Sequence, residues 1–353
     1  MNPSAAQLYD DLKRVYDPRE FSALGVQIAR WEAERDNPLR GKRILDGTPI
    51  FRNTMLKYCA LLAAGADLTV SAGEDIPCDP EILPLLPKFG IRVADAAALT
   101  ETYDAISDCG GRHRQVRSRS GFVELTRSGV SRYRRCPQPV INADASVFKD
   151  FETAYGTGDG FVRAMNALGH DDFSGKRILV FGGGKVGLGI AGRCRRAGAR
   201  PTVVDLKRPD VMDESIDFIA AEDLSAVRRA IAEAWCVVSA TGVTGALEPH
   251  AEALAASPAL IANMGLDDEF SPRLPADRVL NRKTPLNFIL PEPTRLMFIA
   301  PVMALVNTSL RLLLTEPLPP GLQDPPPRAS MDALLDLAAT GIDWNRELQG
   351  DAS

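Results

Sequence analysis

The sequence predicts an α/β protein built from two domains, each with a parallel β-sheet. Three observations support this fold class. The chain has 353 residues, which is more than a single hydrophobic core usually organises. Short apolar segments alternate with segments of helical periodicity along most of the chain. At residues 177–191 an apolar run leads through a glycine turn into a helix, as where a strand of a parallel sheet meets its crossover helix.

The composition is that of an ordinary globular protein. Hydrophobic residues make up 45% of the chain and charged residues 25%, and the formal net charge is −5. This charge gives no electrostatic reason to expect a nucleic acid or a membrane as partner. The N-terminus lacks a basic segment followed by an apolar core, and no apolar run approaches the ~20 residues that span a bilayer. We therefore expect a cytoplasmic protein.

The cysteines and histidines indicate neither a disulfide framework nor a metal site. The six cysteines form no C-x-x-C pair, and the three histidines lie far apart in the chain. Reduced thiols of a cytoplasmic protein explain this pattern.

Residues 1–150 are predicted to form the first α/β domain. The expected helices are two within residues 1–40, one capped by Asn53 or Thr54 and ending at Ala64, and one over residues 80–89 that Pro84 and Pro87 would interrupt. The expected strands are residues 68–70, 90–93 and 103–107. This alternation predicts a parallel sheet with crossover connections.

A long helix over residues 145–168, softened near residues 156–158, is expected to lead into the second domain at residues 151–295. A helix that joins two α/β domains is a natural hinge. The helix after the glycine turn should end at Gly198, and a further helix should cover residues 224–234. The further strands expected in this domain are residues 202–204, 218–220, 235–240, 259–262 and 286–290.

The C-terminal segment is predicted to return to the first domain. An apolar helix, residues 296–316 in the domain assignment, is expected to be kinked or restarted at Pro301. Residues 317–353 are assigned to a linker and a last helix. The linker, residues 317–327, contains six prolines and should be stiff. Ser330 is the expected cap of the last helix, which would end at Ala339.

The glycine turn has the spacing of a dinucleotide-binding loop. Gly182, Gly184 and Gly187 stand in the order G-x-G-x-x-G. In such loops the first glycine permits a tight turn, the second lets a pyrophosphate approach, and the third lets helix and strand pack closely. Asp205 ends the next strand, where an acidic side chain accepts hydrogen bonds from the ribose of NAD and repels the 2′-phosphate of NADP. The sequence thus predicts a Rossmann domain that binds NAD; the alternative is a turn that binds nothing.

Other residues near the same end of this sheet are expected to contact the cofactor. Lys185 and Val186 open the helix that follows the glycine turn. Two later strands end on Thr241-Gly242 and on Asn263, at the carboxyl ends of the strands where a nucleotide lies in such folds.

Residues 112–135 contain eight arginines, which allow two interpretations. They form a solvated face with salt bridges, or some of them hold a phosphate or carboxylate group of an anionic substrate.

The segment Pro139–Gly158 (PVINADASVFKDFETAYGTG), followed by the glycine loop, resembles the central region of S-adenosylhomocysteine hydrolases. The resemblance covers residues 120–265, including Ala240–Gly242 and Asn263–Gly265. It implies two domains with a cleft between them, a substrate domain formed by N-terminal and C-terminal segments, tightly held NAD and a homo-oligomer. In that family NAD oxidises a ribose hydroxyl, a thiol is eliminated, water adds, and the ketone is reduced again.

The resemblance also assigns roles to single residues. Lys149 stands at the family's active-site lysine, where it would help to remove the hydroxyl proton. Glu152 falls where the family has an aspartate that contacts the sugar hydroxyls, but one residue nearer the lysine. Asn263 falls on an asparagine beside the nicotinamide, and Thr126 and Ser128 fall among threonines near it. The alternative for Lys149 is an exposed helix lysine.

Other family residues are changed in this sequence. The family's His-Met-Thr is Arg52-Asn53-Thr54, and the second aspartate before Gly-Gly is Cys109, after Asp108. The glutamate before the threonine run is Leu125, with Glu124 one place away. Such changes in a pocket usually change specificity.

Two further replacements affect the same chemistry. The histidine after Asn-x-Gly is Leu266, and the late Gly-His-Pro is replaced around Glu292. Glu292 is therefore a candidate substitute acid or base, and the alternative is an ordinary loop carboxylate. We assign Asn53, Thr54, Asp108 and Thr157 to the substrate site.

The sequence leads to one main functional hypothesis and two alternatives. The main hypothesis is an NAD-dependent enzyme that oxidises a hydroxyl- or amine-bearing carbon of a small polar substrate. We expect this enzyme to form a homo-oligomer, either a dimer or a tetramer. The alternatives are a genuine adenosylhomocysteinase and a non-catalytic NAD-binding partner.

Overall fold

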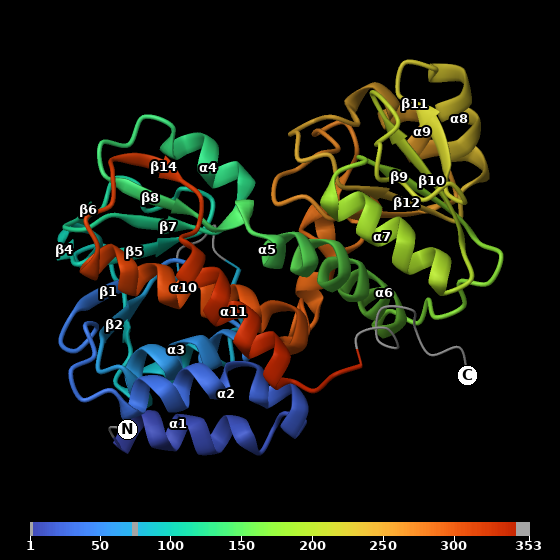
Figure 1. Cartoon of the computed structure of the whole chain (residues 1–353). Helices are drawn as coiled ribbons and strands as arrows, with labels where there is room; N and C mark the ends of the chain where they lie inside the picture. The colour runs from blue at the N-terminus through green and yellow to red at the C-terminus, as the bar shows by residue number, and fades with distance from the viewer. Residues whose placement is uncertain (1–2, 73–76, 344–353) are drawn as a thin grey trace. The chain divides into compact units, whose positions relative to one another are not determined.

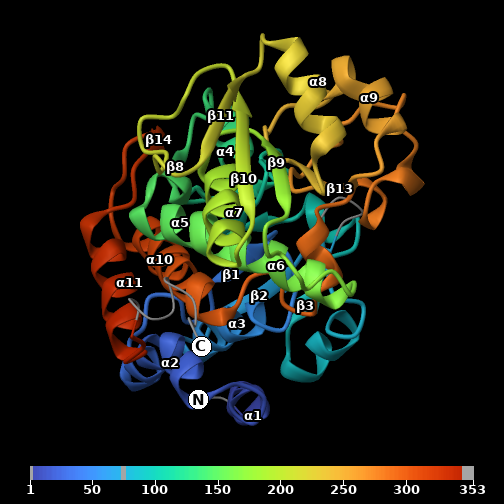
Figure 2. The ribbon, with the colours of Figure 1, turned by 90° about the vertical axis from the view of Figure 1, so that its right-hand side faces the viewer.

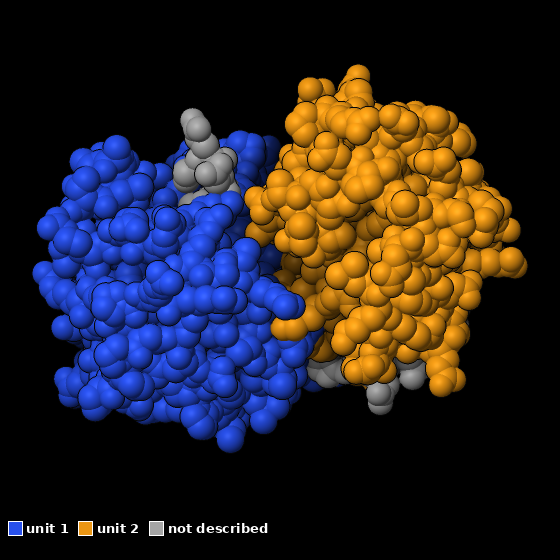
Figure 3. All heavy atoms as spheres, turned by 90° about the horizontal axis from the view of Figure 1, so that it is seen from above, with its two compact units in different colours: residues 1–150, 295–342 blue, residues 151–294, 343–353 orange. Residues whose placement is uncertain are grey.

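The computed structural model describes residues 3–72 and 77–343, which divide into two compact units (Figures 1 and 3). Unit 1 comprises residues 1–150 and 295–342, and unit 2 comprises residues 151–294 with the C-terminal residues 343–353. Each unit contains a parallel sheet with helices packed against it. The predicted α/β class with parallel sheets is therefore confirmed.

Unit 1 contains a seven-stranded sheet of order β14-β8-β7-β5-β1-β2-β3, in which every neighbouring pair is parallel. These strands are β1 Arg43–Asp46, β2 Asp67–Val70, β3 Arg92–Val93, β5 Ala105–Asp108, β7 Phe122–Glu124, β8 Pro139–Asn142 and β14 Gly321–Gln323. A separate two-stranded ribbon joins β4 Thr102–Tyr103 to β6 Arg117–Ser118. The expected single strand over residues 103–107 is thus split, because Asp104 turns the chain between β4 and β5.

The helices of unit 1 come from both ends of the chain. They are α1 Pro3–Lys13, α2 Pro18–Ala33, α3 Thr54–Ala63, α4 Arg127–Tyr133, α10 Leu296–Thr315 and α11 Pro327–Ala339, together with most of α5 Val147–Phe151. The proline-containing segment over residues 80–89 forms only a short 3₁₀ helix, Leu83–Phe89. The two N-terminal helices are as predicted.

Helix α10 fills the core of unit 1. It is 20 residues long and apolar enough to cross a membrane, so the prediction that no apolar run approaches this length is wrong. However, 89% of its most apolar window is buried inside the structure, as in the core helix of a folded domain. Pro301 lies in the second turn, and the helix continues through it.

The proline-rich segment after α10 is more ordered than a linker. Residues 321–323 pair with β8 as the parallel edge strand β14, which corrects the prediction of a stiff connection. The prolines lie on either side of this short strand, so they remove no hydrogen-bond donor from within it. Helix α11 begins at Pro327, so Ser330 lies inside the helix and is not its cap.

Unit 2 contains a five-stranded parallel sheet of order β11-β10-β9-β12-β13 (Figure 2). The strands are β9 Arg177–Phe181, β10 Arg200–Asp205, β11 Asp217–Ala220, β12 Cys236–Ser239 and β13 Leu260–Asn263. The helices are α6 Thr157–Ala167, α7 Lys185–Arg196, α8 Leu224–Glu233 and α9 Ala251–Ala256. The expected strand at 286–290 is instead a 3₁₀ turn, Leu286–Ile289. Flanking Pro285 and Pro291 lack the N–H groups that a strand would need.

The helix expected over residues 145–168 is interrupted in its hydrogen-bond pattern. Residues 152–156 form a π-helical turn between α5 and α6, and the boundary of the two units falls at residues 150 and 151. Within unit 2, α6 and this turn pack very closely on α7. A Cβ on Gly158 would lie 2.5 Å from the carbonyl oxygen of Gly189, and one on Gly189 would overlap the carbonyl oxygen of Ala154. The two glycines therefore permit backbone contact between the helices.

A buried polar network joins α2, α10 and α11 in unit 1. Asp332 accepts hydrogen bonds from Arg30 at 2.7 Å and from the hydroxyl of Thr308 at 2.6 Å. Asp336, one turn further along α11, is fully buried, and no hydrogen bond of ordinary geometry reaches its carboxyl oxygens from the described residues. Burial raises the pKa of Asp336 to about 8, and the charge of Asp332 adds to this effect while that of Arg30 opposes it.

Asp336 should therefore make unit 1 less stable as the pH rises. Its folded-state pKa of about 8 exceeds that of an unfolded aspartate, so the folded chain holds the extra proton between about pH 4 and pH 8. Relative to Asp336→Asn, the wild type should lose about 1.4 kcal/mol of unfolding free energy per pH unit in this window. Denaturant titrations from pH 5 to pH 8 measure this. Exposed Asp10→Asn is the control, and parallel curves for wild type and Asp336→Asn would contradict the prediction.

Candidate functional site

The glycine loop between β9 and α7 has the backbone that its spacing predicts. Gly182 has a φ of +104°, and a Cβ there would overlap the carbonyl oxygen of Ala240. A Cβ on Gly187 would overlap the carbonyl oxygen of Gly182. Gly184 differs from both, because nothing lies within 4 Å of the position its Cβ would take. The first and third glycines thus serve packing, while the second faces open space.

The open face of Gly184 lies at the N-terminus of α7. No side chain of the N-cap residue Gly184 caps this end of the helix, and the backbone N–H groups of the first helical turn point out of its N-terminus. These donors and the helix dipole favour an anionic group, and the space beside Gly184 admits one. The arrangement fits the pyrophosphate of a dinucleotide.

Asp205 is held at the carboxyl end of β10 beside this loop. Its Oδ2 accepts a hydrogen bond from the N–H of Gly183 at 2.5 Å. A Cβ on Gly183 would lie 3.0 Å from that oxygen and 2.6 Å from Cγ of Pro209. Gly183 therefore has no room for a side chain, a requirement that the G-x-G-x-x-G spacing does not reveal.

A buried glutamate shapes the neighbouring loop after β12. Oε2 of Glu269 accepts hydrogen bonds from the N–H and the hydroxyl of Thr241, both at 2.8 Å, and Oε1 accepts one from the N–H of Gly242 at 2.7 Å. The hydroxyl of Ser239 also donates to Glu269. Sequence reasoning missed Glu269, because it stands in an acidic run with no distinguishing spacing.

Asn263, at the end of β13, uses its side chain within the same region. The amide nitrogen donates to the carbonyl oxygens of Gly265, Asp267 and Lys283 at 3.0, 3.0 and 2.6 Å. The amide oxygen accepts from the N–H of Gly265 at 3.1 Å. In this arrangement the buried Asn263 orders the loop that follows the strand.

Unit 1 gathers a second set of polar residues at the carboxyl ends of β5 and β7. Asp108 accepts hydrogen bonds from the N–H of His113 at 2.9 Å and from the hydroxyl of Tyr133 at 2.7 Å, and its Oδ1 lies 2.9 Å from Nδ1 of His113. Burial opposes ionisation of Asp108, but the hydrogen bonds and charge of His113 and the bond from Tyr133 outweigh it and lower the pKa. A carboxylate so placed fixes the orientation of the buried imidazole ring.

Glu124 binds the backbone of the loop that follows β5. It accepts hydrogen bonds from the N–H groups of Gly110 and Gly111 at 3.0 and 2.9 Å, and from the N–H and hydroxyl of Thr126, both at 2.7 Å. Burial and the charge of Asp108 raise the pKa of Glu124 to about 7, although these bonds oppose the shift. The carboxylate occupies the space that a side chain on Gly129 would need.

A buried lysine of α3 extends its side chain to the carboxyl end of β1 in the same sheet. Lys57 donates hydrogen bonds to Asp46 and, at 3.1 Å, to the hydroxyl of Ser107, and its side chain is only 2% exposed. Sequence reasoning missed Lys57 and His113, because each stands alone in the sequence without a recognisable motif. Helix α3 brings Lys57, and the loop after β5 brings His113, to the carboxyl edge of the sheet.

The predicted catalytic residues divide between the two units. Lys149 is half-buried in α5 and belongs to unit 1. Glu152 is buried in the π-helical turn of unit 2, where it accepts a hydrogen bond from the Thr153 hydroxyl at 3.1 Å. Glu292 is partly exposed in unit 2, and its carbonyl oxygen accepts a hydrogen bond from Arg163 at 3.1 Å. Their catalytic roles stay predictions.

The other predicted contacts are distributed in the same way. Thr126 caps α4 by accepting a hydrogen bond from the N–H of Gly129, and Ser128 is exposed beside it in unit 1. Asn53 and Thr54 are buried at the start of α3, also in unit 1. Thr157 begins α6 in unit 2. The structure brings Asp108, Glu124 and Thr126 into one hydrogen-bonded cluster, through the loop at Gly110.

The sheet and the glycine loop define unit 2 as a Rossmann-type NAD(P)-binding domain. Its sequence-order topology, 3-2-1-4-5, places the glycine loop and Thr241 beside the reversal of strand order, where such sheets bind nucleotides. A family model described as "Putative NAD(P)-binding" matches residues 171–265. The predicted Rossmann domain is therefore confirmed.

The sequence is similar to adenosylhomocysteinases, which confirms the resemblance to S-adenosylhomocysteine hydrolases. The protein of Thermococcus kodakarensis is 26% identical over 273 residues, which cover 68% of this chain and 63% of that protein. The Aeropyrum pernix protein is 29% identical over 215 residues, covering 52% and 51%. The Sulfurisphaera tokodaii protein is 27% identical over 284 residues, covering 72% and 67%. The chain thus spans about half to two-thirds of the length of these relatives.

Among solved structures, a dipicolinate synthase chain from Bacillus halodurans aligns over 79% of the present chain and 99% of its own length. The sequence identity is 13% and the TM-score is 0.45.

The loop geometry predicts opposite effects for two glycine substitutions. Gly184→Ala fits an ordinary extended backbone and open space, so the fold should persist while NAD affinity falls by roughly tenfold or more, because the methyl group obstructs the pyrophosphate. Gly187→Ala should instead destabilise unit 2 by about 1–3 kcal/mol through overlap with Gly182. Fluorescence titration with NAD and denaturant unfolding measure the two effects. Gly192→Ala, on the same helix with ordinary space, should leave NAD affinity unchanged and should not destabilise unit 2.

Proposed function

We propose that the chain is an NAD-dependent enzyme that oxidises a hydroxyl- or amine-bearing carbon of a small polar substrate. The observation that carries the proposal is the open face of Gly184 at the uncapped start of α7, beside Asp205. Similarity to adenosylhomocysteinases supports an enzyme that retains NAD for catalysis. Asp205 favours NAD over NADP, because a carboxylate repels the 2′-phosphate.

In this proposal, bound NAD supplies the hydride acceptor, and residues of the chain move the proton. Lys149 removes the proton from the reacting hydroxyl, and Glu152 holds that hydroxyl in position. Glu292 is a further candidate acid or base. The buried Asp108 orients His113, which gives unit 1 a second group able to exchange protons.

The substrate is proposed to differ from S-adenosylhomocysteine. Cys109, Leu125 and Leu266 stand where the resembling family carries acid–base groups. Burial raises the pKa of the Cys109 thiol to about 12, so the thiol stays neutral and cannot replace an aspartate as a base near pH 7. A pocket with these changes should bind a different polar molecule.

A second candidate function is adenosylhomocysteinase itself, and the names of the relatives favour it. The third hypothesis, a non-catalytic NAD-binding partner, shares the predicted cofactor site. We also propose that the protein forms a homo-oligomer and acts in the cytoplasm.

Purified protein should release NAD on denaturation, identified by chromatography and mass. Native protein incubated with S-adenosylhomocysteine should release no thiol, and it should show no near-ultraviolet absorbance of reduced nicotinamide. Thiol release would establish the second candidate instead. Failure to detect NAD, even after incubation with it, would contradict the proposal from its first step.

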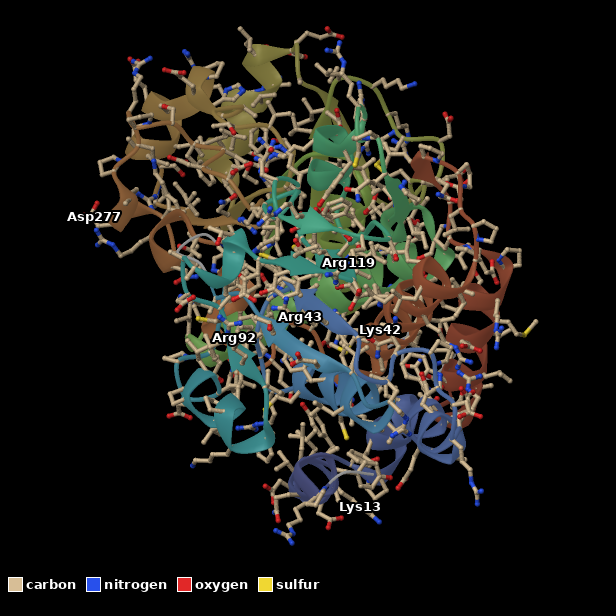
Figure 4. All side chains as sticks on the ribbon, turned by 90° about the vertical axis from the view of Figure 1, so that its left-hand side faces the viewer. Lys13, Lys42, Arg43, Arg92, Arg119 and Asp277 are labelled. Carbon is tan, nitrogen blue, oxygen red and sulfur yellow. The ribbon has the colours of Figure 1, made fainter. Side chains whose placement is uncertain are left out.

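Substitution of Lys149 tests the assigned proton transfer. With any hydroxyl or amine compound that reduces bound NAD, Lys149→Met should lower the rate of reduction by about 10²–10⁴-fold, because general-base assistance is lost. NAD content should be unchanged. Lys42→Met removes an exposed lysine of the same unit and is the matched control (Figure 4). Equal rates for the two variants would exclude Lys149 as the base.

A further inference from the structure

Three arginines converge on the loop that follows β5 in unit 1. Arg112, Arg114 and Arg132 each donate a hydrogen bond to a different carbonyl oxygen of this loop. The three bonds join Arg112 to Cys109 at 3.5 Å, Arg114 to Gly111 at 3.1 Å, and Arg132 to Gly110 at 2.8 Å. Three positive charges therefore surround three consecutive residues.

The loop backbone is shaped to admit one of these arginines. Gly111 has a φ of +63°, and a Cβ on it would lie 2.9 Å from Cβ and 3.1 Å from Cδ of Arg132. Any other residue at position 111 would be strained and would displace Arg132. Glu124 anchors the same loop through the N–H groups of Gly110 and Gly111. The arginines are thus attached to an ordered support.

These three arginines have no carboxylate partner within the described part of the chain. A guanidinium group has five N–H donors, and each of the three uses one of them on a loop carbonyl. Most of their donors therefore remain available for an external acceptor. Arg112 is half-buried, so part of its charge is held away from bulk water.

Arginines at the amino ends of the strands show the opposite pattern (Figure 4). Arg43, which begins β1, and Arg92, which begins β3, both pair with Glu101. Arg119 pairs with Asp104 at 3.0 Å. Three arginines at this edge therefore form ion pairs, although Arg117 at the same edge donates only to a carbonyl oxygen. Arg112, Arg114 and Arg132, at the loop after β5, form no ion pair within the described residues.

The arginine loop also lies within electrostatic reach of the lysine assigned to catalysis. Burial and the charge of Glu124 raise the pKa of Cys109, while the charges of Lys149 and Arg112 oppose that shift. Both cations are therefore within electrostatic reach of the Cys109 thiol. Arg112 and Lys149 therefore act on the same thiol, which relates the arginine loop to the lysine assigned to catalysis.

We propose that Arg112, Arg114 and Arg132 form a subsite for the phosphate or carboxylate group of a small substrate. Planar guanidinium groups bind such oxyanions with paired hydrogen bonds. The link to catalysis rests on the proposed function, because it uses the role assigned to Lys149. The subsite itself depends only on the geometry of unit 1.

Inorganic phosphate and acetate are suitable probes of the subsite. Saturating NAD keeps them from binding at the glycine loop, and a constant ionic strength keeps general charge screening from changing the unfolding temperature. Phosphate or acetate should raise the unfolding temperature of the wild type in a saturable manner. Arg132→Gln and Arg112→Gln should each raise the concentration of probe needed for half-saturation by about tenfold, because each substitution removes a charge-assisted contact. A larger shift with phosphate identifies a phosphate substrate, and a larger shift with acetate identifies a carboxylate.

Arg117→Gln is the matched control. Arg117 is exposed in the same unit and donates only to the carbonyl oxygen of Thr100, at the other edge of the sheet. This variant should respond to the probes like the wild type. An equal loss in Arg117→Gln, no shift in the wild type, or tighter binding of a short oligonucleotide than of phosphate would each overturn the subsite.

NAD release on denaturation, measured on the purified protein before any NAD is added, separates this inference from the proposed function. If the protein binds phosphate through Arg132 but never binds NAD, the subsite is supported and the proposed function is contradicted. If the protein holds NAD but neither phosphate nor acetate raises its unfolding temperature, the proposed function is supported and the subsite is contradicted.

Discussion

Buried carboxylates that bind backbone N–H groups determine the loops at the carboxyl ends of both sheets. Glu124 binds the loop after β5 in unit 1, and Glu269 binds the loop after β12 in unit 2. Each glutamate takes the space beside a glycine, Gly129 or Gly265, where a side chain would overlap it. Loop N–H groups in a buried position need partners, and a carboxylate can accept several of them at once. Both candidate sites rest on this arrangement.

The dinucleotide site depends equally on the absence of side chains. Gly187 lets α7 approach the turn at Gly182, while Gly158 and Gly189 let α6 approach α7. Together these contacts fix the start of α7 beside β9, so that the N-terminal turn of the helix begins at the open side of Gly184. Backbone packing in unit 2 thus positions a binding surface that is itself mostly backbone.

Much of the fold could be predicted from the sequence, because it depends on local patterns. Apolar strands and the spacing of Gly182, Gly184 and Gly187 identify the Rossmann domain without tertiary information. Lys57, His113 and Glu269 could not be found in this way, since their partners come from strands or loops distant in the chain. Strand β14 could not be predicted for a different reason. Prolines usually exclude a strand, but here they lie on either side of a three-residue edge strand.

The composition of unit 1 from both ends of the chain affects how the protein can fold during synthesis. Strand β14 and helices α10 and α11 supply an edge and part of the core of a unit whose other elements precede residue 151. A ribosome therefore finishes residues 151–294, which carry the whole sheet of unit 2, before it delivers the segments that close unit 1. The usual N-terminal-first order is thus reversed, since unit 2 has the shorter-range contacts and can form while unit 1 still exposes apolar surface. We therefore expect chaperones to bind mainly the first half of the nascent chain, where apolar surface of unit 1 stays exposed.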